Sequence, residues 1–204
     1  VCPFMKKIGI DLDGVVFDSE TMFMTEAELY DVRVLHRNSL IAPEEPRVQK
    51  KYAWTKEETD EYICRYSVSD AFGVIPGAKE VISLLRESGC KIYFISARGQ
   101  FDEREKVIAL RKLDEAGIRG DAFIWGKLDK LDVCLNNGIG AMIDDRYDVC
   151  DSLCRHGILC LYYQSLGRKQ MKSGEHLVQV HHWGEIYREL YNRGWLREKT
   201  DEKI

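Results

Sequence analysis

The chain has 204 residues, of which 45% are hydrophobic and 31% charged, and its formal net charge is -4. This balance is typical of a globular protein with one domain and room for an insertion, and it excludes a global electrostatic attraction to nucleic acid or to an anionic membrane. No apolar run approaches the ~20 residues of a membrane-spanning helix. The seven cysteines form no Cys-x-x-Cys pair and no zinc-binding spacing, and the first residues lack the pattern of a signal peptide. We therefore expect a cytoplasmic protein whose thiols pack in its core.

The hydrophobic pattern predicts short buried strands that alternate with amphipathic helices along most of the chain. In chain order, we expect a strand at 7–11, helices at 19–35, 55–68 and 76–88, a strand at 91–96, a helix at 101–116, a strand at 122–125, a helix at 128–136, a strand at 141–143, a helix at 147–155, a strand at 158–163 and a helix at 183–193. Ser19 is the expected N-cap of the first helix, and Thr55 and Glu58 are the expected capping box of the second.

This alternation predicts an α/β fold, with a Rossmann-like three-layer core in which helices cover both faces of a parallel sheet. Residues 18–75 interrupt the alternation with helical segments and two prolines. We expect this segment to form a small helical cap inserted after the first strand. The core then consists of residues 1–17 and 76–204.

Two acids stand at the end of the first predicted strand, where Lys7-Ile-Gly-Ile is followed by Asp11-Leu-Asp13-Gly14. Buried acids without a partner cost desolvation free energy, and open parallel sheets bind their ligands beyond the carboxyl ends of the strands. The pair therefore indicates a site for a divalent cation and a phosphate.

Further polar groups are expected at the same rim of the sheet, because each follows an apolar strand. They are Ser96 after the second strand, Lys127 or Lys130 after the third, and Asp144-Asp145 after the fourth, with Asp148 one helical turn later. A carboxylate can attack phosphorus when Mg²⁺ lies between the two anions, and a hydroxyl can hold the phosphate oxygens. A lysine can offset the charge, and a second acid can move the proton. The set is typical of phosphoryl transfer.

Each signal has an ordinary structural explanation when it is taken alone. Asp-x-Asp-Gly also occurs in calcium loops, although Gly14 comes too early for such a loop. A serine at the end of a strand, a helical lysine and a double aspartate usually have structural roles. The combination of all of them in this order favours the catalytic interpretation.

At these residues the predicted core resembles the haloacid dehalogenase-like superfamily of phosphotransferases. The resemblance implies that Asp11 is the nucleophile and that Asp13 is the general acid and base. It also implies a charge-balancing lysine, for which Lys130 is preferred over Lys127 because Asp-Lys-Leu opens the helix before the Asp-Asp strand. Members that retain the second aspartate are phosphatases or phosphomutases rather than dehalogenases.

The same resemblance implies a phosphate site with Ser96, Ala97 and Lys130, and a Mg²⁺ site with Asp11, Asp13 (through its carbonyl), Asp144 and Asp145. Arg98 is expected to bind phosphate as well, because it leaves the same rim as Ser96 and a guanidinium pairs with phosphate through two bonds.

A narrower resemblance is to the 5'(3')-deoxyribonucleotidases and their bacterial relatives. It rests on Asp11-Leu-Asp-Gly-Val-Val-Phe-Asp-Ser-Glu20, on Ile143-Asp-Asp-Arg-Tyr-Asp148, and on an insertion between the first and second motifs. Ser-Ala-Arg98 is closer to the bacterial relatives than to the animal enzymes, and the insertion does not align. Asp-Asp-Arg also resembles the phosphatase half of polynucleotide kinase-phosphatases, but a polynucleotide track usually needs a basic stripe, which argues against nucleic acid here.

The predicted cap is rich in aromatic residues, namely Phe23, Tyr30, Tyr52, Trp54, Tyr62 and Tyr66. Most of these rings are expected to pack the cap helices, and one of them to face the site and stack on a nucleobase. We expect Trp54 to be that ring and Asp18 to be a second substrate residue, although Asp18 also favours the start of a helix. His181-His182 is expected at the surface, because adjacent side chains point apart.

Together these residues predict a magnesium-dependent phosphomonoesterase of 5'-nucleotidase type that acts on (deoxy)nucleoside monophosphates through an aspartyl-phosphate intermediate. The alternatives are a sugar-phosphate or polynucleotide 3'-end phosphatase of the same superfamily and, outside enzymes, a phosphate-binding or phosphoryl-receiving module. We expect Mg²⁺ as the cofactor and a small phosphorylated metabolite as the partner, with no membrane or nucleic acid. A homodimer is left open.

Overall fold

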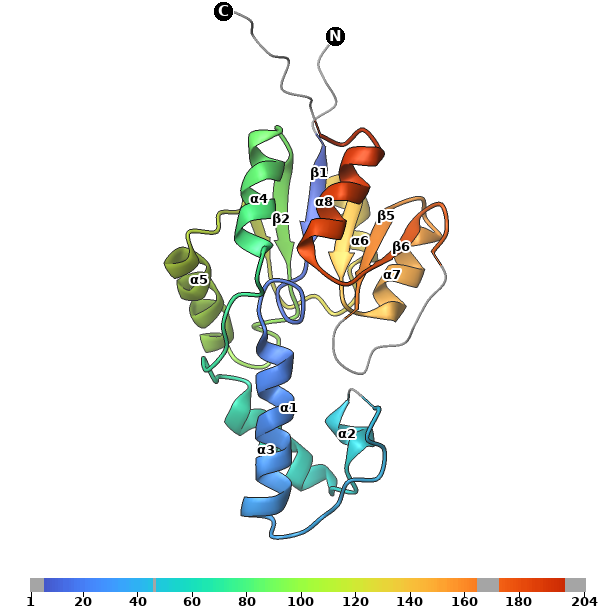
Figure 1. Ribbon diagram of the computed structural model, residues 1–204. Coiled ribbons are helices and arrows are strands. Elements are labelled where there is room, and N and C mark those ends of the chain that lie inside the picture. The colour runs from blue at the N-terminus through green and yellow to red at the C-terminus, as the bar shows by residue number, and fades with distance from the viewer. Residues whose placement is uncertain (1–5, 46, 165–172, 197–204) are drawn as a thin grey trace, which may run out of the picture.

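The computed structural model describes residues 6–45, 47–164 and 173–196. In these segments six strands form one parallel sheet in the order β3-β2-β1-β4-β5-β6 (Figure 1). The strands are β1 (Lys7–Ile10), β2 (Lys91–Ile95), β3 (Ala122–Ile124), β4 (Ala141–Asp144), β5 (Leu159–Tyr163) and β6 (Leu177–Val180). Because β1 lies between β2 and β4, the strand order reverses beside it, and open parallel sheets bind ligands at such a point.

Helices cover both faces of the sheet, which is the middle of three layers. One face packs against α4 (Ala78–Glu87), α5 (Arg104–Ala116) and α8 (Trp183–Asn192), and the other against α6 (Leu131–Asn137) and α7 (Tyr147–Cys154). Successive residues of β4 alternate between the two cores, since Ala141 and Ile143 belong to the first and Met142 to the second. The predicted α/β fold with a Rossmann-like three-layer core is confirmed.

Two short elements were not expected from the hydrophobic pattern, namely β6 and the helix α2 (Val48–Lys51). The helix expected at 19–35 is present as α1 (Ser19–Leu29), which continues into the π-helical turn η1 (Tyr30–Val34). A run of four residues does not distinguish a helix from a strand by its period alone, so tertiary contacts select its conformation. In β6, for example, Val178 aligns with Leu161 of β5.

The two longer cap helices begin in different ways. At the start of α3 (Lys56–Tyr66), Thr55 and Glu58 form the predicted capping box, with each side chain accepting a hydrogen bond from the other residue's amide. The predicted N-cap role of Ser19 is wrong, because Asp18 occupies the N-cap position of α1. The Ser19 hydroxyl instead donates to the Asp13 carboxylate at 2.5 Å, and a hydrogen bond to an ionised acceptor is stronger than one between neutral groups.

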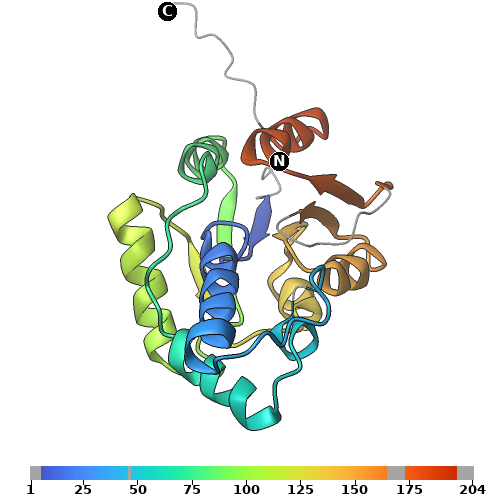
Figure 2. The same ribbon diagram turned by 60° about the horizontal axis from the view of Figure 1, so that its bottom comes forward.

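The cap helices lie beyond the carboxyl ends of the strands, and Figure 2 shows α1, α2 and α3 in front of the sheet. They have an aromatic core of their own, formed by Tyr30, Tyr52 and Tyr62 with Phe23, Trp54 and Tyr66 packed against them. Trp54 stacks on Tyr52 with 4.4 Å between ring centroids, and its Nε1 donates to the Asp31 carboxylate at 2.8 Å. The cap therefore has a hydrophobic core distinct from the two cores of the sheet.

Two segments that we call the cap linkers, residues 16–18 and 72–75, connect the cap to the core. They pair with each other through hydrogen bonds from the Asp18 amide to the Gly73 carbonyl at 3.0 Å and from the Ile75 amide to the Val16 carbonyl at 2.8 Å. The chain thus enters and leaves the cap at one place.

No helix in the described part of the chain is long and apolar enough to cross a membrane. Cys134, Cys150 and Cys160 are buried thiols in the core beneath α6 and α7, as expected for small hydrophobic side chains.

We expect Trp54→Phe to destabilise the protein, because it keeps an aromatic ring but removes a donor from the buried Asp31 carboxylate. A hydrogen bond to a charged group is worth ~1.5–3 kcal/mol, so the free energy of unfolding should fall by about 2 kcal/mol. Chemical denaturation measures the change, with Tyr191→Phe as the control because Tyr191 is 50% exposed. Equal stability of Trp54→Phe and the unmodified protein would show that this hydrogen bond does not hold the cap together.

Candidate active site

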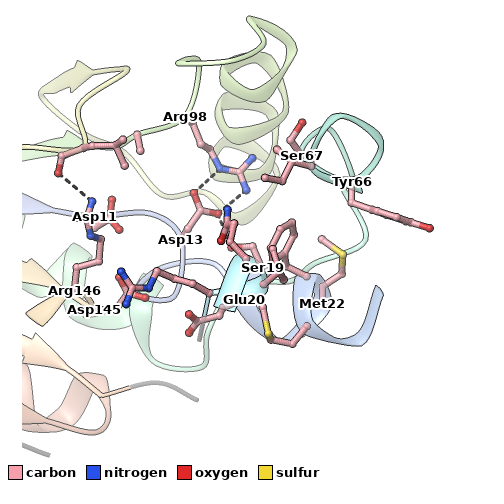
Figure 3. A pocket seen from close by; sticks show the side chains of 18 of the residues that line it. Asp11, Asp13, Ser19, Glu20, Met22, Tyr66, Ser67, Arg98, Asp145 and Arg146 are labelled. Atoms are coloured by element: carbon pink, nitrogen blue, oxygen red, sulfur yellow. Dashed lines mark hydrogen bonds and ion pairs between the residues drawn. The ribbon is translucent and has the colours of Figure 1, made fainter. Parts of the chain in front are cut away.

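The first carboxylate of the site is placed by the central strand. Asp11 directly follows β1, and its amide donates to the Ile143 carbonyl of the neighbouring β4 at 2.9 Å. Asp144 and Asp145 follow Ile143, so the ends of β1 and β4 bring three acids to the same edge of the sheet. Figure 3 shows Asp11 and Asp145 in the inner part of a pocket at that edge.

A tight turn after Asp11 makes room for Asp145. Gly14 has a φ of +73°, in the left-handed region that favours glycine. A Cβ atom at this position would lie 2.3 Å from Asp145 Oδ2. Gly14 is thus required twice, once for the backbone conformation and once for the space that the Asp145 carboxylate occupies.

Lys130 is the lysine that reaches the first carboxylate. Its Nζ lies 2.7 Å from Asp11 Oδ1 and 2.7 Å from Asp144 Oδ2, and the side chain is buried. Burial alone would lower the pKa of Lys130, but the two carboxylates outweigh it and raise the pKa above its ordinary value. Lys127, the other candidate, is exposed and lines the mouth of the pocket.

Three acids are close enough to share a cation. One carboxylate oxygen each from Asp11, Asp144 and Asp145 lies within 4.8 Å of the others, and all three residues are buried. Burial raises the pKa of Asp11, and the charge of Asp144 adds to this effect while Lys130 opposes it. A set of buried carboxylate oxygens fits a hard divalent cation such as Mg²⁺. Asp144 also accepts a hydrogen bond from the Arg146 amide at 2.9 Å. Both of its carboxylate oxygens therefore already have a partner inside the protein, Lys130 and Arg146.

The loop after β2 carries the residues expected to hold phosphate. Ser96 is buried, and its hydroxyl oxygen accepts the Arg98 amide at 3.2 Å. Ala97 lines the pocket. The Lys127 amide donates to the Ser96 carbonyl at 3.0 Å, which ties this loop to the loop after β3.

Asp13 is held by two other side chains. The Arg98 guanidinium donates through Nε to Oδ2 at 2.8 Å and through Nη2 to Oδ1 at 2.6 Å, and the Ser19 hydroxyl donates to Oδ1 (Figure 3). Burial opposes the charge on Asp13, but Arg98 and Ser19 outweigh it and hold the pKa of this carboxyl below its ordinary value. Asp11 and Asp13 are thus two apart in sequence and held by different cations.

The pocket lies between the sheet edge and the cap, and it has a volume of about 1470 Å³. Asp11, Asp13, Lys130 and Asp145 line its inner part together with residues of the loops after β2, β3 and β4, and residues of α1, α2 and α3 line it from the cap. Asp148 reaches its rim, where it pairs with Arg146. The structure therefore brings the expected catalytic residues to one cavity.

Two expected substrate residues are placed elsewhere. Trp54 is packed in the aromatic core of the cap and is not among the residues that line the pocket, which corrects the expectation that it faces the site. Its ring is more stable between other rings, with its N–H on a buried carboxylate, than at a wet cavity. Asp18 is exposed at the start of α1 and does not line the pocket either, whereas Glu20 does.

Two rings of the cap do line the pocket, Phe23 of α1 and Tyr66 of α3, next to Met22 and Ile63. Both were among the aromatic residues named from the sequence, but neither was chosen there as the ring that faces the site. Helical spacing shows which residues share one face of a helix. It does not show that the faces with Phe23 and Tyr66 point to the pocket, because this depends on how the cap packs. His181 and His182 are exposed near Glu185, and no described cluster of metal ligands contains them.

The chain is similar to known proteins in structure, but no similarity in sequence was found. No family model matches the chain, and no curated protein matches it. A haloacid dehalogenase family hydrolase from Deinococcus radiodurans R1, solved with bound phosphate and sodium, has a TM-score of 0.66 at 16% identity and covers 94% of this chain and 97% of its own. A predicted phosphatase from Clostridium acetobutylicum has a TM-score of 0.64 at 18% identity and covers 93% of this chain and 100% of its own.

A haloacid dehalogenase-like hydrolase from Streptococcus pneumoniae is also similar, with a TM-score of 0.59 at 16% identity, and covers 81% of this chain and 88% of its own. At identities this low, similarity shows the fold alone. The chain has the fold of the haloacid dehalogenase-like hydrolases.

We expect Gly14→Ala to weaken cation binding, because the new methyl group would displace the Asp145 carboxylate. Displacing groups that orient metal ligands typically lowers metal affinity by about 10–100-fold. Calorimetric titration with Mg²⁺ measures the loss. Gly126→Ala is the matched control, since Gly126 also has a positive φ but has open space around its Cβ position. If both variants bind Mg²⁺ equally, Asp145 does not belong to the metal site.

Proposed function

We propose that this protein is a magnesium-dependent phosphomonoesterase of the haloacid dehalogenase-like superfamily that works through an aspartyl-phosphate. The observation that carries the proposal is the position of Asp11. Its carboxylate lies buried at the end of the central strand, 2.7 Å from Lys130 and beside two further acids. The similar structures support the same reaction class, since one is called a predicted phosphatase and another holds phosphate.

The first step is attack by an Asp11 oxygen on phosphorus. The new bond forms as the bond from phosphorus to the leaving oxygen breaks, and the product is an aspartyl-phosphate. Ser96 and Ala97 would hold the phosphoryl oxygens, and Lys130 would offset charge on the nucleophile. Mg²⁺ held by Asp11, Asp145 and the Asp13 carbonyl would supply the positive charge that lets the two anions approach.

Asp13 moves the proton in both steps. It gives a proton to the leaving oxygen, and it later takes a proton from the water that hydrolyses the aspartyl-phosphate. The products are inorganic phosphate and the restored Asp11 carboxylate. Arg98 and Ser19 hold Asp13 as a carboxylate in the free protein. The substrate therefore binds as its phosphate monoanion, and its proton passes to Asp13 and from there to the leaving oxygen.

The substrate class that we propose is a (deoxy)nucleoside monophosphate. Met22 and Tyr66 lie at the end of the pocket away from Asp11 (Figure 3), and Phe23 and Ile63 line the same wall. A nucleobase can bury its flat faces against such side chains, and stacking on one ring is worth ~1–3 kcal/mol.

The charges in the pocket favour a mononucleotide over a polynucleotide end. Glu44 and Glu45 line the α2 side of the pocket, and Arg47 there is paired with Glu45 at 3.0 Å. On this side of the pocket, additional phosphates of a polynucleotide would meet these carboxylates, which repel them.

The decisive test is phosphate release from 5'- and 3'-nucleotides, deoxynucleotides and sugar phosphates, with and without Mg²⁺. We expect Mg²⁺-dependent turnover of nucleotides, which Asp11→Asn lowers by about 10⁴-fold or more because an amide cannot form the intermediate. Asp132→Asn, at an exposed position on α6, is the control and should retain full activity. Turnover of sugar phosphates alone would exclude the nucleotidase assignment, and activity of Asp11→Asn would exclude the mechanism.

The apolar wall gives a second test, with Phe23→Leu. This variant keeps an apolar side chain but removes the flat ring, so KM for nucleotides should rise about tenfold, while KM for ribose 5-phosphate stays constant. Tyr191→Leu serves as the comparison and should leave both values unchanged, since Tyr191 is half-exposed and does not line the pocket. A nucleotide KM that Phe23→Leu leaves constant would place the base elsewhere.

A further inference from the structure

We infer that Arg98 is a positioning residue for Asp13, held in place by the two cap linkers, and not a ligand of the substrate phosphate. This assignment rests on the proposed function, and it gives Arg98 a role other than the phosphate binding expected from its neighbours in sequence. It follows from what each part of the guanidinium contacts.

The guanidinium faces Asp13 with two of its nitrogens. Nε and Nη2 bind one carboxylate oxygen each, at 2.8 Å and 2.6 Å. Two parallel bonds of this kind fix the plane of a carboxylate as well as its distance. Figure 3 shows the third nitrogen, Nη1, on the side away from Asp13, and it is buried with no hydrogen-bond partner in the described part of the protein.

The guanidinium also contacts two aromatic rings that pack against each other. Arg98 lies 4.8 Å from the ring centroid of Phe72 and 5.6 Å from that of Phe17, and the two rings are 5.1 Å apart. Such cation–π contacts are strongest where the cation is desolvated, and only 9% of the Arg98 side chain is exposed. Arg98 is thus immobilised before a substrate enters.

The two rings come from the two cap linkers. Phe17 stands in the linker that enters the cap and Phe72 in the one that leaves it. Ser19, in the first turn of α1, supplies the remaining bond to Asp13. Each of these three contacts depends on the position of the linkers, so a displaced cap would also release the Asp13 carboxylate. Positional errors of about 1 Å can cost a catalytic group 10²-fold in rate.

The two roles of Arg98 make different predictions for different leaving groups. A nucleoside leaves as an alkoxide and needs the proton that Asp13 delivers, whereas 4-nitrophenolate leaves as a stabilised anion. If Arg98 positions Asp13, its loss slows the first reaction much more than the second. If Arg98 held the phosphate, its loss would slow both reactions equally and weaken the binding of inorganic phosphate.

The experiment measures release of the alcohol in the first turnover, so that hydrolysis of the aspartyl-phosphate does not contribute. For Arg98→Ala we expect nucleoside release about 100-fold slower and 4-nitrophenolate release less than about fivefold slower. Inorganic phosphate, titrated by calorimetry, should bind within about twofold of its original affinity. The double variant with Asp13→Asn should be no slower than Asp13→Asn alone.

Lys112→Ala is the matched control, because Lys112 lies over the same Phe72 ring at 5.3 Å without contacting Asp13. It should leave the ratio of the two rates unchanged. Phe72→Leu tests the linker and should shift the ratio in the same direction as Arg98→Ala by about three- to tenfold. If Arg98→Ala fails to fold, the same ratio is measured for Phe72→Leu and for Arg98→Lys. Arg98→Lys keeps the charge but loses the two parallel bonds to Asp13, so it should shift the ratio in the same direction.

Equal slowing of both substrates together with weaker phosphate binding would overturn the inference and return Arg98 to the phosphate site. An unchanged ratio in Phe72→Leu would overturn the part assigned to the linkers. If the unmodified protein turns over neither substrate, the proposed function itself fails, which is a different result from a variant that loses both activities.

Discussion

Three buried carboxylates within 4.8 Å of one another are the constraint on which the rest of the site depends. Anions this close in a poorly solvated interior repel one another strongly, and each has also lost its hydration. Lys130 offsets part of that charge by contacting Asp11 and Asp144 at once. It reaches both because β4 lies beside β1 and because α6 begins at the same edge of the sheet, at the residue after Lys130. The remaining negative charge is what makes this edge suited to a divalent cation.

The neighbouring Asp13 has the opposite electrostatic surroundings. Its cation is a guanidinium with two parallel hydrogen bonds, and the hydroxyl of Ser19 adds a third donor. Asp13 is thus kept ionised and oriented, while burial and the charge of Asp144 disfavour the anion of Asp11. Two residues of one short motif thus have different electrostatic surroundings. Lys130, at the start of α6, contacts Asp11, and Arg98, in the loop after β2, contacts Asp13.

Much of this arrangement could be predicted from the sequence, because it depends on local rules. The alternation of apolar segments predicts the parallel sheet, and acids that follow apolar strands must gather at the carboxyl edge. The Thr55 capping box is a local pattern as well. Features that depend on the partner of a side chain could not be predicted in this way. Trp54 looks like a ligand-stacking ring until Tyr52 and Asp31 are seen to occupy its faces and its N–H. Ser19 has the spacing of an N-cap, but the carboxylate it binds lies in another turn of the chain.

The pairing of the cap linkers has a consequence for how such proteins can diverge. Because the Asp18 amide and the Gly73 carbonyl are joined by one hydrogen bond, the chain between them is a closed loop whose ends are already fixed. The entropy of closing a loop changes only slowly with its length. A longer, shorter or unrelated segment can therefore be exchanged at this place at little cost to the sheet. The paired linkers therefore separate the carboxylates at the sheet edge from a module that can be exchanged, and the two can change independently over time.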